Sequence, residues 1–517
     1  MDPELFYRNG WQCFFGNRKG VYRFTERQVM KRASTPSFVL TLKLNTSVSD
    51  DAVLDYRFFC GARMYNVLVR HCRKQLSMLK EDKTYRELLA KRMNTGISKK
   101  EINAINQALS DIRMDYGLSM YQLEGYVKLQ QHRYHKHIDS MTAQKIADSV
   151  WRAVEKYLFG NGHTIHFCRM DDFLSFEGKN NVSGIRFKDG RLHWNGLVIQ
   201  AKHDRSDRYE VESLKHHVKY CRILRRPVGT RYHYYLQLIL DGKPPIKHTY
   251  GNGDVGIDIG TSTCAVVSSE KCTLTVLGDD VRRYDQKIAR LNRRLDRSRR
   301  ATNPGNYKDD GTIKRGRKKW HYSNTYRKTV MKKKSLERRQ TDSLKQSQER
   351  FANEVIAQGT SIYAENMSFA GLQRRAKETT INKNGRYNRK SRFGKSLKNH
   401  APARFLSVLD RKLKYIGAEL HLVNTKTFRA SQYNHVTDDY VKKKLSCRGQ
   451  TINGKWIQRD LYSAFLLMNS NTALDRPDRD KCMKTYKTFV TNHDLCISSL
   501  LSDNRKHPSS FGLKKVS

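Results

Sequence analysis

The chain has 517 residues, with 99 Lys and Arg against 50 Asp and Glu, which gives a formal net charge of +49. This excess of one sign indicates a polyanionic partner, for which nucleic acid is the first candidate and a membrane surface the weaker one. No stretch approaches the ~18 apolar residues of a membrane-spanning helix, and "MDPELFYRNGWQ" lacks the apolar run of a signal peptide. The ten cysteines form no CxxC pair, which favours free thiols. We expect a cytoplasmic, nucleoid-associated protein that is neither secreted nor membrane-bound.

The first half of the chain predicts a β-domain interrupted by helices. Phe38–Leu44 alternates apolar and polar residues, as a half-buried strand does. With Ser49 and Asp50 as the expected N-cap, apolar residues then follow at helical spacing to about residue 160. Strands return in "IRFKDGRLHW", where a turn at Asp189 and Gly190 should pair Phe187 with Leu192, and in "YHYYLQLIL".

The second half predicts an α/β domain. It opens with the strand "DVGIDIGTSTCAVVSS", which a basic helical hairpin over residues 281–358 follows, its second helix beginning near Lys318. A strand ending in "IYAEN", the helix "PARFLSVLDRKLKYIG", the strand "AELHLVNT" and a helix after "QRD" complete it. Strands interleaved with helices are typical of an α/β fold.

The hairpin segment is the most basic part of the chain. Residues 281–350 contain 24 Lys and Arg against 7 Asp and Glu, a net +17. Charge runs are usually solvated helix faces, but this excess favours contact with a nucleic-acid backbone. The candidate nucleic-acid-binding residues of the hairpin are Arg293, Arg294, Arg297, Arg299, Arg300, Lys318 and Lys319.

Three acidic residues lie far apart in the sequence but at comparable positions. Asp258 interrupts an apolar strand, and the glycines at 256 and 260 would leave its side of the strand bare for a metal ion and a phosphodiester. Glu365 ends a strand, where α/β sheets place their sites. Asp460 precedes an apolar helix face. Taken one at a time, a turn Asp, a surface Glu and a helix N-cap explain them as well or better.

Taken together, the three acids favour a metal site. An isolated buried carboxylate is costly, whereas three that converge are explained at once by bound divalent cations. Two Mg²⁺ ions can activate a water and stabilise the leaving oxygen of a phosphodiester. With the net charge of +49, the sequence therefore predicts a metal-dependent nuclease in which Asp258, Glu365 and Asp460 hold the metal ions.

The segments "GIDIGTSTCAVVS", "IYAENMSFAGL" and "QRDLYSAFLL", in this order, resemble the three parts of the split RuvC domain of TnpB proteins and compact type V CRISPR effectors. The resemblance is specific over about residues 250–470 and looser before that. It implies an RNase H-like nuclease core with an N-terminal wedge β-barrel that a helical recognition insertion interrupts. It also implies an RNA-guided DNA endonuclease, with a structured guide RNA and target double-stranded DNA as partners, that cuts beside a short target-adjacent motif.

The resemblance implies a division of the chain into six parts. These are an N-terminal segment with the first wedge strand (1–48), the recognition helices (49–160), the rest of the wedge barrel (161–250), RuvC parts I and II with the hairpin (251–425), a target-nucleic-acid-binding insert (426–458), and RuvC part III with the tail (459–517). Asp258, Glu365 and Asp460 occupy the family's catalytic positions.

The insert departs from the family pattern. Many TnpB proteins carry two CxxC pairs before the third motif, but Cys447 is the only cysteine in this interval. Tetrahedral zinc needs four good ligands, and His435 with Cys447 does not supply them, so we expect no zinc. Contact with nucleic acid is still expected from Lys442, Lys443, Lys444 and Arg448.

Other functions remain open from the sequence. "GIDIGTST" resembles the first phosphate loop of actin-like ATPases and sugar kinases, although no second Asp-Gly-rich phosphate segment or glycine-rich adenosine segment follows. A cut-and-paste transposase also uses three acids on a related core. A catalytically silent RNA-guided DNA-binding regulator would keep the partners without cleavage, although the presence of all three acids argues against it.

Overall fold

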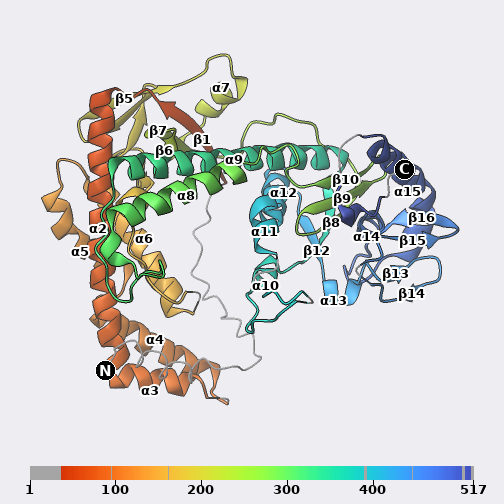
Figure 1. Cartoon of the computed structure of the whole chain (residues 1–517), viewed down its shortest axis with the longest axis horizontal. Coiled ribbons are helices and arrows are strands. Elements are labelled where there is room, and N and C mark those ends of the chain that lie inside the picture. The colour runs from red at the N-terminus through yellow and green to blue at the C-terminus, as the bar shows by residue number, and fades with distance from the viewer. Residues whose placement is uncertain are drawn as a thin grey trace.

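A computed structural model describes residues 36–94, 96–160, 162–382, 384–388, 390, 393–444, 446–503 and 507–513. The N-terminal segment predicted for residues 1–35 lies outside these ranges. Within them, two sheets form the cores of two lobes, and the long helix α9 (Asn324–Gln358) runs from one lobe to the other (Figure 1). No helix in the described ranges is long and apolar enough to cross a membrane.

In the first lobe, the predicted strand and the helical insertion that follows it are confirmed. β1 (Ser37–Leu44) buries Phe38, Leu40, Leu42 and Leu44 on one face. The insertion comprises α2 (Val48–Glu81), α3 (Lys83–Arg92), α4 (Lys99–Asp115), α5 (Met120–Arg133) and α6 (Ser140–Leu158). The cap predicted at Ser49 and Asp50 is wrong: Ser47 is the N-cap, and its side chain and that of Asp50 form a capping box.

The strands on both sides of the insertion form one antiparallel sheet in the order β2-β6-β7-β1-β5-β4-β3. Their bounds are β2 (Ser175–Glu177), β3 (Arg186–Lys188), β4 (Arg191–Trp194), β5 (Leu197–Lys202), β6 (Val218–Val228) and β7 (Arg231–Asp241), with α7 (Arg208–Leu214) between β5 and β6. The predicted hairpin is confirmed, since Phe187 pairs with Leu192 and both turn residues have positive φ. The sheet is curled, since β3 at one end of this order contacts β6 near the other end. No ladder joins β3 to β6 in the described residues, and the closed barrel stays a prediction.

The second lobe is built on a five-stranded sheet of order β10-β9-β8-β11-β12. β8 (Asp254–Ile259), β9 (Thr263–Ser268) and β10 (Cys272–Val276) form an antiparallel meander, whereas β11 (Ser361–Glu365) and β12 (Leu420–Val423) run parallel to β8. On one face, Val255, Ile257 and Ile259 pack against α9 and α12 (Pro402–Ile416). The other face packs against α14 (Arg459–Met468) and α15 (Arg479–Ser502).

The predicted basic hairpin is confirmed as α8 (Asp285–Thr302) packed along α9. Its second helix begins at Asn324 with Ser323 as the N-cap, not near Lys318. At 35 residues, α9 is about 52 Å long. It contacts both β6 and α12, and therefore fixes the basic hairpin against both lobes.

Shorter elements complete the chain. They are α10 (Phe369–Leu372), α11 (Gly394–His400), α13 (Thr425–Phe428), the hairpin of β13 (Tyr433–Asn434) and β14 (Asp439–Tyr440), the hairpin of β15 (Gly449–Ile452) and β16 (Lys455–Gln458), and 3-10 turns at Met170–Asp172, Pro304–Asn306 and Ser509–Phe511.

Candidate active site

Asp258 and Glu365 lie on neighbouring parallel strands. In the register of β8 and β11, Ile362 pairs with Val255 and Ala364 pairs with Ile257. The next residues along the two strands are Asp258 and Glu365. Because paired residues of adjacent strands share a face, both carboxylates lie on the face opposite the Val255 and Ile257 side chains. That face is the one covered by α14.

Asp460 reaches the same place from α14. This helix contacts β8, β9 and β11, and its first turn contains Asp460. The interpretation of Asp460 as an N-cap is wrong, because the cap is Gln458, whose side-chain oxygen accepts the Leu461 N–H at 2.7 Å. The carboxylate of Asp460 is therefore not used for capping and is available to the site.

Gly256 brings the helix onto the strand. A Cβ at this position would overlap the carbonyl oxygen of Ala464 and crowd the amide nitrogen of Met468. The expectation that Gly256 leaves room for a metal ion and a phosphodiester is therefore wrong: the backbone of α14 fills that space. Since Ala464 lies one turn after Asp460, this close approach sets the first turn of α14 near Asp258.

All three carboxyls are harder to ionise than exposed ones. Burial raises the pKa of Asp258 well above its usual range, and the charges of Glu365 and Asp460 raise it further. Burial likewise raises the pKa of Glu365 and of Asp460. These effects place the three acids of the sequence prediction in one electrostatic cluster, which a cation would stabilise.

Arg459 is the charge that partly compensates this cluster. Its guanidinium lowers the pKa of all three carboxyls. Arg448, which precedes β15, also lowers the pKa of Asp460. Arg459 Nη1 and the Ser463 hydroxyl are buried without a hydrogen-bond partner, although Ser463 is near enough to Asp258 to lower its pKa. Neither residue was predicted; the charge beside Asp460 in "QRD" was the available signal.

The donor set suits a hard divalent cation. Carboxylate oxygens are the ligands that Mg²⁺ prefers. In the described ranges, however, no three His, Cys, Asp or Glu side chains are grouped so that they could hold one ion together. Three carboxylates that share two ions about 4 Å apart do not all need to reach the same ion.

The insert of residues 426–458 is anchored to the core by buried side chains. His435 is fully buried; its backbone N–H donates to the Tyr462 hydroxyl, which also lies 2.7 Å from Nδ1. Burial lowers the pKa of His435 to about 4. Tyr433, Ile452 and Ile457 join the same core. The cysteine at 447 is exposed and takes no part in this anchor, so aromatic and aliphatic packing explains how the segment is held.

The structure divides the predicted basic residues into two groups. Arg293, Arg294 and Arg297 are exposed on α8. Arg299 and Arg300 instead bind Asp296 at 2.8 and 2.9 Å, and they lie over the rings of Trp320 and Tyr307. Arg299 and Arg300 therefore stabilise the tip of the hairpin. Fewer of their N–H donors can bind nucleic acid than the sequence predicted.

The other predicted basic residues also differ in exposure. Lys319, Lys442 and Lys444 are exposed, whereas Lys318 donates to the Arg315 carbonyl. Lys443 is half-buried, contacts Gln450, and has a pKa lowered by burial and by the nearby Arg459. Lys443 lies near Arg459, and Arg448 lies near Asp460. Part of the insert therefore borders the acidic cluster.

The chain aligns with solved structures of Cas12f complexes. No protein-family model matches the chain, and no curated protein matches it. A cryo-EM structure of a Cas12f1–sgRNA–target DNA complex aligns over 84% of this chain and 99% of that chain, with 12% identity and a TM-score of 0.40. A cryo-EM structure of a CRISPR–Cas12f ternary complex aligns over the same shares with 12% identity and a TM-score of 0.22. At these TM-scores the alignments do not carry an assignment.

Proposed function

We propose that this chain is an RNA-guided DNA endonuclease whose active site is the Asp258–Glu365–Asp460 cluster. The observation that carries the proposal is the convergence of these three acids on one face of the five-stranded sheet, with raised pKa values. Buried like charges that the protein neutralises only in part are expected at functional sites rather than in structural cores. The three sequence motifs that resemble a RuvC-type, RNase H-like core supply β8, β11 and α14 of this site.

Asp258, Glu365 and Asp460 would hold two Mg²⁺ ions. When bound, such a pair activates the attacking water and stabilises the leaving oxygen of the phosphodiester. The chain's own contribution is to hold the carboxylates in place: β8 and β11 fix two of them by their register, and the contact at Gly256 fixes the third. Arg459 offsets part of the repulsion among them before a cation binds.

The nucleic-acid partners proposed are a guide RNA and a guide-matched double-stranded DNA. The charge of +49 and the exposed face of α8 suit backbones that are bound by shape and charge. Arg448 adds a cation close to Asp460, where a scissile phosphate would lie. The first aligned complex contains sgRNA and target DNA, the same two kinds of partner. Whether the guide derives from a transposon end, as in TnpB, or from a CRISPR array is settled by sequencing RNA that copurifies with the chain.

The proposal is tested by combining the chain, its copurified RNA and a matched duplex with Mg²⁺. Cleavage that requires the guide sequence and is lost in Asp258→Ala, Glu365→Ala and Asp460→Ala, with RNA binding retained, supports it. Tight guide-dependent DNA binding without a cut product would assign the regulator function instead. Hydrolysis of ATP that depends on Asp258, without DNA cleavage, would assign the ATPase function, and strand transfer without RNA would assign a transposase.

A further inference from the structure

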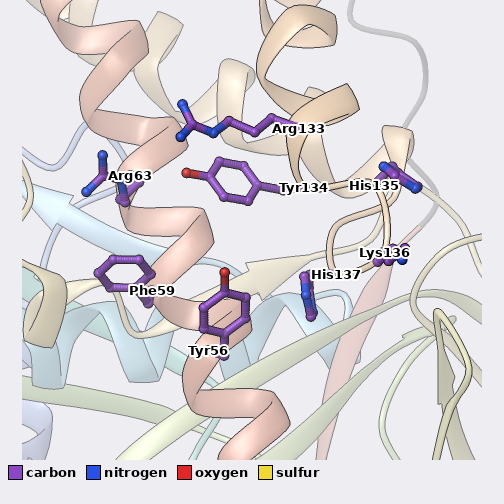
Figure 2. A pocket seen from close by; sticks show the side chains of 8 residues that line it. All are labelled: Tyr56, Phe59, Arg63, Arg133, Tyr134, His135, Lys136 and His137. Carbon is purple, nitrogen blue, oxygen red and sulfur yellow. The ribbon is translucent and has the colours of Figure 1, made fainter.

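A second candidate site lies in the helical insertion, on α2 and the connection between α5 and α6. It is a hollow of about 540 Å³ lined by Tyr56, Phe59, Arg63, Arg133, Tyr134, His135, Lys136 and His137 (Figure 2). This volume is in the range of pockets that hold one small ligand, about 300–1,000 Å³. None of the lining residues is acidic, and none belongs to the sites described above.

The floor of the hollow is aromatic although it faces solvent. Tyr56, Phe59 and Arg63 recur at helical spacing on one side of α2, while Leu54 and Phe58 on the other side are buried. Tyr56 is 48% exposed and Phe59 is 39% exposed. The two rings are nearly parallel, with an interplanar angle of 25° and centroids 6.1 Å apart. The solvent face of a helix is normally polar, so exposed neighbouring aromatics indicate a binding surface.

The opposite wall is supplied by the α5–α6 connection and is cationic. The Tyr134 side chain extends from it toward α2, with Arg133 beside it, and the Tyr56 hydroxyl points toward the Tyr134 ring (Figure 2). Arg133 and Arg63 lie over the rings of Tyr134 and Phe59, at 5.9 and 5.7 Å from their centroids. Aromatic faces surrounded by cations provide both stacking for a base and charge for its phosphate.

The connection is held in place before any ligand binds. Gln131 donates to the Ile138 carbonyl, Asn195 donates to the His135 carbonyl, and His137 packs edge-on against Tyr56 with the centroids 4.7 Å apart. Ile138 is buried. A wall fixed in this way loses little conformational freedom when a ligand binds, which favours affinity.

We propose that this hollow binds an unpaired nucleotide, stacking its base on Tyr56 and Phe59 and placing its phosphate against Arg63 and Arg133. A base inside a duplex is already stacked on both faces, so only an unpaired or displaced nucleotide offers a free face to these rings. The site goes beyond the proposed cleavage function and does not depend on the acidic cluster. Guide RNA and displaced DNA share the chemistry that the hollow recognises.

The test is photocrosslinking of the full chain to octamers that contain one 4-thiouridine, or one 4-thiothymidine in the DNA arm, with the crosslinked residues mapped by mass spectrometry. We expect crosslinks at Tyr56, Phe59 or Tyr134 from single strands and none when the modified base is paired. Stacking contributes about 1–3 kcal/mol per base, so Tyr56→Ala and Phe59→Ala should each reduce the yield at this site at least ~5-fold. Comparing the RNA and DNA arms shows which strand the hollow prefers.

Two control variants separate stacking from folding. Tyr56→Phe keeps the ring and should keep the crosslink, while Tyr121→Ala removes a tyrosine that is 77% exposed on α5 outside the hollow and should change nothing. Crosslinks elsewhere on the chain serve as an internal standard in each sample. Absence of crosslinks in the hollow of the unmodified chain, an unchanged yield in Tyr56→Ala, or an equal yield from the paired base would overturn the proposal.

Discussion

Gly256 of β8 lies directly against the backbone of Ala464 in α14, closer than any residue with a Cβ could lie. This contact joins the strand that contains Asp258 to the helix that contains Asp460. Asp258 follows Gly256 by two positions on the same face of the strand, and one helical turn separates Ala464 from Asp460, so the same contact sets the spacing of both acids. The geometry of the proposed active site therefore depends on a residue that performs no chemistry.

Gly256→Ala should destabilise the chain and displace α14 from β8. Inserting a methyl group into a filled core typically costs about 1–3 kcal/mol, and here the obstacle is backbone, which cannot rotate away. Guide-dependent cleavage should fall more than the fraction of folded protein does. The matched control is Gly125→Ala, since a Cβ there meets nothing within 4 Å in α5; it should be neutral or slightly stabilising in urea unfolding.

Mg²⁺ should stabilise the folded chain through the acidic cluster. A cation at 100 times its Kd adds about 2.7 kcal/mol to the free energy of unfolding, so thermal unfolding after chelator treatment should show a rise in Tm on adding Mg²⁺. Asp258→Asn combined with Glu365→Gln should remove most of this rise. Asp309→Asn combined with Glu354→Gln makes the same charge change away from the cluster and should keep it. Equal shifts in both double variants would exclude the cluster as the metal site.

The two groups of arginines in α8 should behave differently. Changing Arg293, Arg294 and Arg297 to Gln should weaken RNA binding and reduce the slope of log affinity against log salt, by up to about 0.9 for each phosphate that is no longer neutralised. Arg299→Gln with Arg300→Gln should instead lower stability, because these side chains hold Asp296 and the hairpin tip. RNA titrations at several salt concentrations, together with urea unfolding, separate the two effects. The reverse pattern would show that the tip arginines are the RNA contacts.

The buried His435 should make stability depend on pH. Its pKa in the folded chain is about 4, below the ordinary value of about 6.5, so the unfolded chain binds more protons between these values. The contribution of His435 to the free energy of unfolding is therefore greatest above pH 6.5 and falls as the pH drops toward 4, by about 2 kcal/mol at pH 5. His435→Gln should lose less stability than the unmodified chain between pH 7 and pH 5 in urea unfolding. Parallel pH curves for the two chains would contradict this assignment.

The sequence predicted the elements more reliably than the contacts between them. Alternation in Phe38–Leu44 and the Asp189–Gly190 turn are local signals, and both were confirmed. The role of Gly256 could not be predicted, because it depends on a helix about 200 residues later in the chain. The cap at Gln458 was missed because the helix starts earlier than Asp460, a preferred cap residue, suggested.

The candidate site was predicted in part for a similar reason. The acids at strand ends could be predicted from the apolar residues around them. The effect of Arg459 and Ser463 on the pKa of Asp258 depends on the packing of α14 against the sheet, which the sequence does not show. The ion pairs that Arg299 and Arg300 form with Asp296 could have been predicted from the sequence, since Asp296 lies three and four residues before them on the same helix face. The anchoring of the insert by His435 required the position of Tyr462.

The most direct measurement is cleavage of a guide-matched DNA duplex by the chain with its copurified RNA, in Mg²⁺ and in EDTA. We expect a cut product in Mg²⁺ only, its loss when the duplex does not match the guide, and its loss in Asp258→Ala with RNA binding unchanged. A duplex that stays intact at every Mg²⁺ concentration while it is tightly bound, or a cut product that persists in Asp258→Ala, would show that the acidic cluster does not cleave DNA.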